Sequence, residues 1–384
     1  MKIISVANTT FSKTGGLARC VIVVGEALRK RGHSVTFLLS EDVGGCKGGK
    51  GLSLVTFPFF VVISILRCIK KENGCDIVVM HSLSAFVYVF LRMIVRSLPP
   101  CVVLSAGDDM LRWSLEREEE RLGLIRLSLK AKILYFNFVI RPSRFALRHA
   151  DHIITPVTAE KEFYCSSLGL SPDKISLVHS PVTTNCFTNR TFKERPDRLL
   201  FFGGWEWRKG TRYLLQAFER ICDSHPYVRL TLAGVGLSAQ EMRPRLPEPL
   251  RDRIDVIPFV SEDQVPGLYA QHDIFLFPSL MEAMPLVVLE AMASGMPVVT
   301  TNACGMKDAI EDGVSGFLVP LRDAQMLARK VQLFLDDVSL CKRIGMNAQQ
   351  RAQALSLESC VEKTSTVYER VIKECSLKKN HGRK

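Results

Sequence analysis

The sequence predicts an α/β protein whose parallel sheets are divided between two domains. Three observations lead to this fold class. Residues 273–320 have the pattern of a strand, a helix and a second strand, and the chain opens with the same order around a pair of glycines. At 384 residues the chain is too long for one small core. This length suits two domains of roughly 150–200 residues each.

The strand–helix–strand unit of the C-terminal half is marked by short apolar runs, proline and glycine. Ile274–Phe277 is short, continuous and closed by Pro278, which is typical of a buried parallel strand. Pro285 stands where the first helical position is expected, because its fixed φ suits a helix start. Gly295 ends that helix, and a second strand follows over residues 297–300.

Two carboxylates lie in this unit. Glu282 falls in the loop after the first strand, and Glu290 lies about one and a half turns into the helix. Ligands of open α/β sheets bind at the carboxyl ends of strands, and helix N-termini attract phosphate groups. A carboxylate beside such an anion site is placed to accept hydrogen bonds from sugar or ribose hydroxyls. A solvated surface helix that carries two Glu residues is the alternative that these residues leave open.

The N-terminal half opens with a strand at Lys2–Ala7, and a loop then leads to a pair of glycines, Gly15 and Gly16. A helix over Leu17–Lys30 and a second strand over Ser34–Leu39 follow. This is a doubly wound opening whose glycines permit close approach of the backbone, but it lacks the dinucleotide-binding pattern of three spaced glycines. A plain turn is the alternative role for the two glycines.

Polar residues follow two further strands of this half. The strand predicted over residues 76–80 leads into His81, and the strand over residues 102–105 leads through Ala106 to Asp109. Because the carboxyl ends of parallel strands meet at one edge of a sheet, both polar side chains are expected at the same crevice. A purely structural role is the alternative for His81.

A glycine loop with two basic residues follows Leu199–Phe202, the first predicted strand of the C-terminal half. The loop runs from Gly203 and Gly204 to Arg208 and Lys209, and a helix follows it. Backbone donors and fixed positive charge at a helix N-terminus are what a diphosphate leaving group needs when no metal assists. A basic turn without a ligand is the alternative.

The composition indicates a folded globular protein with uneven charge. Its hydrophobic content of 47% and charged content of 23% are ordinary for such a protein. Residues 1–192 hold 25 basic and 15 acidic residues, so most of the formal net charge of +12 belongs to this half. A basic half suggests an anionic partner such as a membrane surface, a phosphorylated acceptor or nucleic acid. General solubility charge is the alternative.

The cysteines and the apolar runs indicate the cellular compartment of the protein. The twelve cysteines form no C-x-x-C pair and have no histidine at metal-ligand spacing, which favours a reducing cytoplasm over a disulfide framework or a zinc site. The longest charge-free apolar runs, 51–66 and 77–91, fall short of the roughly 18 residues that a membrane-spanning helix needs. No signal-peptide pattern opens the chain. We expect no transmembrane helix, no metal site and a cytoplasmic protein.

Residues 111–149 are predicted to be helical and strongly basic, with leucine and isoleucine interleaved. The basic residues are Arg112, Arg117, Arg121, Arg126, Lys130, Lys132, Arg141, Arg144 and Arg148. A basic amphipathic surface of this kind can lie on anionic lipid. An ordinary domain helix with a solvated face explains the pattern equally well.

One long stretch carries a family resemblance. Residues 278–301 have the pattern P-S-x-x-E-x-M-P-L-V-V-L-E-A-M-A-x-G-x-P-V-V-x-T, in which seven residues separate Glu282 from Glu290. This pattern resembles the signature of the retaining glycosyltransferases of family 4, also called glycosyltransferase group 1. The match continues through Asp312–Val319, which is similar to the family's D-G-x-x-G-x-L-V stretch.

The resemblance implies the GT-B architecture, in which two Rossmann-like, doubly wound domains face an interdomain cleft. Residues 1–190 would form the acceptor-side domain, and residues 197–358 would form the nucleotide-sugar-binding domain. The polar segment 188–197 is the expected linker. A C-terminal helix over residues 360–376 would pack back onto the first domain.

The resemblance also implies roles for residues of this chain. Glu282, Lys209 and Arg208 would act at the reacting centre, where the two cations neutralise the departing diphosphate. Glu290 would bind the ribose hydroxyls of the donor. The remaining donor-binding residues that it implies are Gly15, Gly16, Gly204, Met284, Pro285, Leu286 and Val287.

The chain departs from the family pattern at two places. Ala106 stands where the family usually has a histidine that contacts the donor sugar, so His81 or Asp109 is the expected substitute on the acceptor side. Gly204 stands where the family has an arginine, and Arg208 is expected to supply that charge from a different position.

The resemblance implies retaining transfer of a sugar from a nucleotide-sugar, UDP- or GDP-linked, without an obligatory metal. The basic first half favours a lipid-linked or saccharide acceptor in cell-surface polysaccharide or glycolipid synthesis, with peripheral contact to an anionic membrane at its inner face. A small soluble acceptor is one alternative, and a catalytically impaired nucleotide-sugar-binding homologue is another. No nucleic-acid partner is expected, because no binding module of that kind appears.

Overall fold

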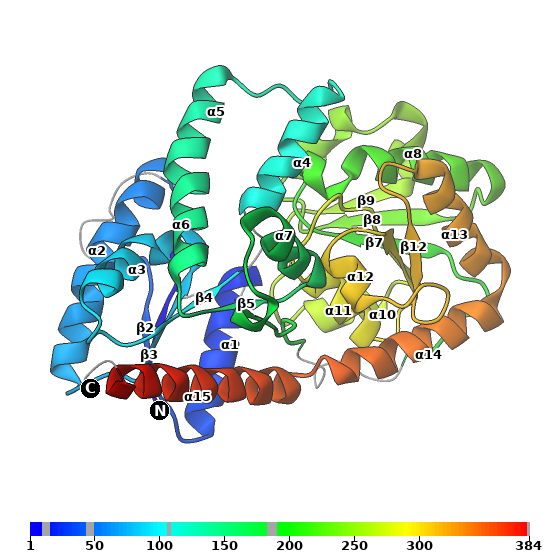
Figure 1. Ribbon diagram of the computed structural model, residues 1–384. Helices are drawn as coiled ribbons and strands as arrows, with labels where there is room; N and C mark the ends of the chain where they lie inside the picture. The colour runs from blue at the N-terminus through cyan, green and yellow to red at the C-terminus, as the bar shows by residue number, and fades with distance from the viewer. Residues whose placement is uncertain (10–15, 44–49, 106–108, 183–189, 382–384) are drawn as a thin grey trace. The chain divides into compact units, whose positions relative to one another are not determined.

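The computed structural model describes residues 1–9, 16–43, 50–105, 109–182 and 190–381, and the side chains of residues 16–19, 50–55 and 379–381 are outside the description. The chain forms two compact units. The first unit contains residues 1–180 and 357–384, and the second contains residues 181–356. Each unit is an α/β body with its own sheet (Figure 1).

The first unit is built on a six-stranded parallel sheet with the strand order β2-β1-β3-β4-β5-β6. Its strands are β1 (Lys2–Val6), β2 (Ser34–Leu38), β3 (Ile77–His81), β4 (Cys101–Leu104), β5 (His152–Thr155) and β6 (Ile175–Leu177). Its longer helices are α1 (Gly16–Lys30), α2 (Lys50–Lys71), α3 (Ser82–Ile94), α4 (Asp109–Arg121), α5 (Leu129–Tyr135), α6 (Arg141–His149), α7 (Thr158–Leu168) and α15 (Leu357–His381).

Alternate residues of this sheet pack against different helix layers, as the two-residue period of a strand requires. Ile4, Val78 and Val103 join one apolar core with residues of α2, α3 and α6. Their neighbours Ile3 and Val79 join a second core that includes α15. Helices therefore cover both faces of the sheet, and the strands are buried on both sides.

The second unit has a six-stranded parallel sheet with the strand order β12-β11-β10-β7-β8-β9. Its strands are β7 (Arg198–Phe202), β8 (Arg229–Ala233), β9 (Ile254–Ile257), β10 (Ile274–Phe277), β11 (Val298–Thr301) and β12 (Phe317–Val319). Its main helices are α8 (Thr211–Ser224), α9 (Ala239–Met242), α10 (Val265–Ala270), α11 (Leu286–Ala293), α12 (Gly305–Ala309), α13 (Ala324–Asp336) and α14 (Val338–Ala354).

The fold class predicted from the sequence is confirmed, because each unit is a doubly wound parallel sheet with helices on its faces. The helical prediction for residues 111–149 is interrupted at residues 122–128. From Leu129 to His149 the chain is continuously helical, since a π-helical segment, Phe136–Ile140, joins α5 to α6.

Residues 190–197, the described part of the expected linker 188–197, pack against the second unit. Arg190 lies within the second unit, where its guanidinium donates to the backbone carbonyls of Ser294, His272 and Tyr269. Lys193 bonds to Asp273 at 3.0 Å. Buried hydrogen-bond acceptors need donors, and these side chains supply them. Arg190 and Lys193 are therefore part of the packed second unit and do not belong to a solvated linker. Sequence composition alone cannot reveal such distant partners.

A partly buried ion pair joins three elements of the first unit. The Asp151 carboxylate accepts from Arg92 at 2.6 and 2.8 Å and from the backbone N–H of Cys101 at 2.7 Å. Burial of Asp151 opposes ionisation, but the hydrogen bonds and charge of Arg92 outweigh it and hold the pKa of the carboxyl below its ordinary value. The carboxylate thereby ties the end of α3 to the starts of β4 and β5.

We predict that Asp151→Asn lowers the free energy of unfolding at neutral pH by about 2 kcal/mol, because Arg92 loses its charged partner. Since the folded carboxyl has a lowered pKa, its contribution is complete above the unfolded pKa of about 4 and is lost as the pH falls below it. The difference in unfolding free energy between wild type and variant should therefore shrink below about pH 4. Urea unfolding followed at several pH values measures it.

Asp255→Asn is the matched control, because its partner Arg229 lies at 2.7 Å in a solvent-exposed pair. Exposed pairs contribute roughly 0–1 kcal/mol, so this variant should unfold almost like wild type. An equal loss in both variants would contradict the structural role assigned to Asp151.

Candidate functional site

The strand order of the second sheet changes direction between β7 and β10. These strands are neighbours in the sheet, with Leu199 paired to Ile274, although about 75 residues separate them in the chain. At such a switch point the chain leaves the two strands in opposite lateral directions, which opens a ligand crevice at their carboxyl ends. The loops after β7 and β10 both begin there, and they carry the residues predicted for donor binding.

The loop after β7 lies directly against the loop after β10. Gly210 has a φ of +69°, and a Cβ at this position would lie 1.9 Å from the carbonyl oxygen of Pro278. The carbonyl of Arg208 accepts from the backbone N–H of Leu280 at 2.8 Å and from the Ser279 hydroxyl at 3.1 Å. Only glycine permits this approach at residue 210. The contact fixes the place of the basic residues that precede it.

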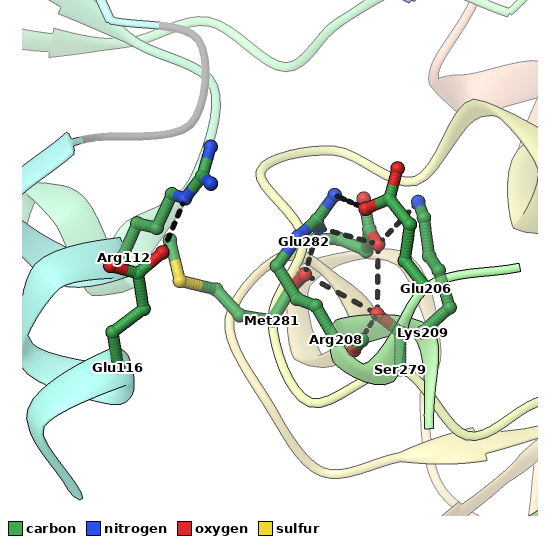
Figure 2. A network of polar contacts seen from close by, with 8 residues as sticks. All are labelled: Arg112, Glu116, Glu206, Arg208, Lys209, Ser279, Met281 and Glu282. Carbon is green, nitrogen blue, oxygen red and sulfur yellow. Dashed lines mark hydrogen bonds and ion pairs between the residues drawn. The ribbon is translucent and has the colours of Figure 1, made fainter. Parts of the chain in front are cut away.

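Glu282 collects three donors at this junction. Its Oε1 atom accepts from the Lys209 ammonium at 2.7 Å, from the Ser279 hydroxyl at 2.8 Å and from the Arg208 guanidinium at 3.2 Å. Figure 2 shows these side chains converging on the carboxylate. The structure therefore brings together the three residues predicted for the reacting centre, and two cations share one carboxylate.

The cations of this cluster have further partners. Arg208 also donates to the carbonyl of Met281 at 2.9 Å and approaches the mostly exposed carboxylate of Glu206 at 3.4 Å. The Lys209 ammonium lies 5.2 Å from the centre of the Phe277 ring. The aromatic ring excludes water from one side of the ammonium. Partial desolvation strengthens the attraction of the ammonium for an anion.

The helix after this loop holds the second predicted carboxylate. α11 begins at Leu286, so Pro285 is its N-cap residue rather than its first helical residue as predicted. The first N–H groups of any α-helix lack intrahelical partners and attract anions. Glu290 is buried one turn further on, and its Oε2 atom accepts from the Tyr269 hydroxyl at 3.2 Å. Tyr269, on α10, also donates to the carbonyl of Val287 at 2.9 Å.

A third loop reaches the same cluster. The backbone N–H of Gly305 donates to the Glu282 carbonyl at 3.1 Å, and the preceding residue, Cys304, has a φ of +40°. A positive φ at a residue other than glycine stores strain and often accompanies a functional site. Ser279, Tyr269 and Cys304 were not identified from the sequence. Ser279 follows Pro278 at the end of a predicted strand, whereas no local signal distinguished Tyr269 or Cys304.

The first sheet has its own switch point between β1 and β3. His81 is the last residue of β3, and its Nε2 atom is buried with no hydrogen-bond partner among the described residues. Burial lowers the pKa of His81 to about 4, so its ring is neutral at pH 7. An unpaired buried nitrogen is costly unless something else binds it.

Asp109 and the two N-terminal glycines complete the predicted residues of the first unit. Asp109 begins α4 and accepts from the Tyr135 hydroxyl at 3.2 Å, and burial raises the pKa of its carboxyl. Gly16 is the first residue of α1. Gly15 and Ala106 lie outside the described residues.

A metal site would need several ligating side chains close together. Among the residues that the structure describes, no group of three or more His, Cys, Asp or Glu side chains is arranged to hold a metal ion. The positive charge at the second switch point comes from Lys209 and Arg208.

Two family models match the chain, one to each half. The model described as "Glycosyl transferases group 1" matches residues 184–351. The model described as "Glycosyltransferase Family 4" matches residues 14–185. The first of these matches contains the whole Glu282 cluster and Glu290.

Curated relatives include glycosyltransferases from several organisms. The putative colanic acid biosynthesis glycosyltransferase WcaL of Salmonella typhimurium is 30% identical over 177 residues, which are 44% of each chain. An uncharacterized glycosyltransferase of Haemophilus influenzae is 25% identical over 94% of this chain and 98% of its own length. A phosphatidylinositol N-acetylglucosaminyltransferase subunit of Schizosaccharomyces pombe is 25% identical over 61% of this chain and 52% of its length. The chain thus spans about half the length of two of these three relatives.

Solved structures of similar fold cover nearly the whole chain. Sucrose-phosphate synthase of Thermosynechococcus elongatus has a TM-score of 0.79 at 18% identity and covers 97% of this chain and 100% of its own. HepE of Anabaena in complex with UDP has a TM-score of 0.70 at 19% identity, covering 96% and 100%. WaaG, involved in lipopolysaccharide biosynthesis, has a TM-score of 0.68 at 18% identity, covering 95% and 99%. At these identities the similarity establishes the fold.

We predict that Gly210→Ala disrupts the junction between the two loops, because its Cβ would overlap the Pro278 carbonyl. The variant should lose about 2 kcal/mol or more of stability through overlap and the unfavourable φ. Thermal unfolding measures the loss. Gly204→Ala is the control, since a Cβ there would meet only the Glu206 side chain at an ordinary 3.5 Å. If the two variants proved equally stable, the close approach at Gly210 would be refuted.

Proposed function

The chain belongs to the group 1 glycosyltransferases of family 4, and we propose that it transfers a sugar from a nucleotide-diphosphate sugar to an acceptor with retention of configuration. The observation that carries the proposal is the Lys209–Glu282–Arg208 cluster at the switch point of the second sheet. Two cations of the loop after β7, held against the loop after β10 by Glu282, can neutralise the charge of a diphosphate.

In the proposed reaction the bond between the sugar C1 atom and the diphosphate oxygen breaks, and its electron pair leaves with the diphosphate. Lys209 and Arg208 neutralise the charge that develops there, an effect of a few kcal/mol for such preorganised groups. A hydroxyl of the acceptor forms the new bond to C1 on the same face, and its proton passes to the leaving diphosphate. Glu282 orients the two cations and hydrogen-bonds the transferred sugar, together with backbone groups at residues 284–287.

Glu290 is proposed to bind the ribose hydroxyls of the donor. Its burial in α11 and the hydrogen bond from Tyr269 hold the carboxylate in one orientation. Preorganisation of this kind reduces the entropy that binding would otherwise cost. The second unit would therefore hold the donor through Glu290 at the ribose and the Lys209 cluster at the diphosphate, with the backbone near Gly204 beside it.

The first unit is proposed to supply the acceptor side. Support comes from His81, whose neutral ring has an unpartnered nitrogen at the switch point of the first sheet. Asp109, the first residue of α4, is proposed to contact the acceptor. The acceptor proposed is a lipid-linked sugar or saccharide at the cytoplasmic face of a membrane. A small soluble acceptor is the second candidate.

UDP-sugars are the first donors to test and GDP-sugars the second. HepE, which shares the fold, was solved with UDP and with UDP-glucose. The base and sugar are selected by pocket shape, which differs among enzymes of one fold. An impaired homologue that binds but does not transfer is the alternative suggested by Gly204 and Ala106.

We predict that one nucleotide-sugar from a panel of UDP-, GDP-, ADP- and dTDP-sugars raises the melting temperature of wild type and is slowly hydrolysed. Lys209→Ala and Glu290→Ala should each weaken its binding about tenfold or more, because each loses one charged contact. Calorimetry measures affinity, and mass spectrometry measures free nucleotide. Lys342→Ala, an exposed lysine on α14, is the control and should bind like wild type.

Two results would count against the proposal. Failure of every nucleotide-sugar to bind wild type would refute the site. Tight binding with neither hydrolysis nor transfer to any lipid-linked or saccharide acceptor would favour the impaired homologue instead.

A second prediction concerns the displaced arginine. Arg208→Gln should weaken binding of the same nucleotide-sugar about tenfold, because the diphosphate loses a cation. Adding Gly204→Arg should restore part of the affinity, since a Cβ at residue 204 meets no backbone closer than ordinary contact. Arg245→Gln, an exposed arginine of the same unit, is the control. If Gly204→Arg rescues nothing, Arg208 does not replace the family's arginine.

A further inference from the structure

The outer surface of one helix layer in the first unit is unusually apolar. Helices α2, α3 and α6 pack over the same face of the sheet, and Figure 1 shows them as neighbours. Phe57, Val61 and Ile65 of α2 face the core. Phe59 and Ile63 of the same helix are about half exposed, at 54% and 48%. α2 therefore has apolar residues on both its inner and its outer side.

The apolar surface continues across the neighbouring helices. Phe59 packs edge-on against Phe86 of α3, with ring centroids 6.0 Å apart, and Phe86 in turn packs against Phe145 of α6 at 6.2 Å. Phe90 of α3 contacts the same Phe145 ring. Near the end of α3, Ile94 is 67% exposed. The aromatic rings thus connect three helices at their outer surface.

α5 continues into α6 through the π-helical segment and carries further exposed apolar residues. It contains no buried residue, and Leu129 and Ile133 are 71% and 54% exposed. Exposed apolar residues scattered singly are normal, but an accumulation of them on neighbouring helices often marks an interaction site. We call the exposed apolar side chains of α2, α3 and α5 the apolar face, represented by Phe59, Ile63, Phe90, Ile94, Leu129 and Ile133.

The segments that carry the apolar face are basic, although Lys132 of α5 pairs with Glu120 at 2.6 Å and Arg92 of α3 pairs with Asp151. Residues 56–71, 82–98 and 122–149 contain eleven lysines and arginines and no aspartate or glutamate. Exposed members include Arg67, Arg96, Arg126, Lys130 and Arg148. Two copies of this surface would repel each other, so self-association through it is disfavoured. A ligand that is both apolar and negatively charged would match the exposed apolar side chains and the basic residues around them.

We propose that the apolar face is a docking surface for an anionic lipid bilayer, lying in the interface with its aromatic and aliphatic side chains among the lipids and its basic residues at the headgroups. No helix in the described part of the chain is long and apolar enough to cross a membrane, so the docking is interfacial. This docking rests on the proposed function with a lipid-linked acceptor, and it adds the surface that would meet the membrane.

The test measures binding to vesicles without any nucleotide or acceptor, so it can fail independently of the proposed transfer. Wild type should sediment with vesicles of phosphatidylcholine that contain about one third phosphatidylglycerol, at roughly 0.05 M salt. It should bind vesicles of phosphatidylcholine alone much more weakly, because the headgroups then carry no net charge.

Two variants separate the apolar and the charged contributions. Replacing Ile94, Leu129 and Ile133 with serine should lower the partition coefficient about tenfold or more, because these exposed side chains lose apolar area but support no core. Replacing Arg126, Lys130 and Arg148 with glutamine should lower it by roughly two orders of magnitude at low salt, at about fivefold per charge.

Matched controls lie on the second unit, which carries no part of the apolar face. Replacing its exposed Phe259, Leu333 and Met346 with serine, or its exposed Arg245, Lys342 and Arg343 with glutamine, should leave binding unchanged. Absence of wild-type binding to the anionic vesicles, or equal losses in variants and controls, would overturn the proposal. So would a dimer in analytical ultracentrifugation that the serine variant dissociates, because a second copy would then cover the face.

Discussion

The Glu282 carboxylate is the contact on which the candidate site depends. It accepts from Lys209, Arg208 and Ser279, and so it joins the loop after β7 to the loop after β10. Two cations this close would repel each other without a shared anion. Because one carboxylate holds both, the loops keep two oriented cations at the switch point, with Glu206 as a further partner of Arg208. A diphosphate entering there would meet charges that are already oriented, which is the condition for electrostatic catalysis.

The sheet order explains why these residues meet. Lys209 and Glu282 are 73 residues apart in the chain, yet β7 and β10 are adjacent strands at the point where the order reverses. The first unit has a comparable point between β1 and β3, where His81 ends a strand with an unpaired buried nitrogen. Each unit thus places its polar residues where an open sheet binds ligands, although the two sheets differ in their order of strands.

Much of this arrangement could be predicted from the sequence. The apolar run at Ile274–Phe277 and the proline after it located β10, and the two glutamates and the basic loop were identified before their pairing was known. The partners came only from the structure, because contacts such as Tyr269 with Glu290 depend on tertiary packing. Arg190 was assigned to a linker for the same reason, since its carbonyl partners are about 80–100 residues away. The sequence indicated an amphipathic surface within residues 111–149, which include α5. The exposed apolar residues of α2 and α3 came only from the structure, because an apolar run does not show which of its residues face solvent.

The most direct measurement is a crystal structure of the chain with UDP or its preferred nucleotide-diphosphate. The account predicts phosphate oxygens within hydrogen-bond distance, about 3 Å, of Lys209 Nζ and of the Arg208 guanidinium, with the ribose hydroxyls on Glu290. Glu282 should remain bonded to at least one of the two cations. A nucleotide whose diphosphate lies away from both cations, or whose ribose lies away from Glu290, would contradict the central claim.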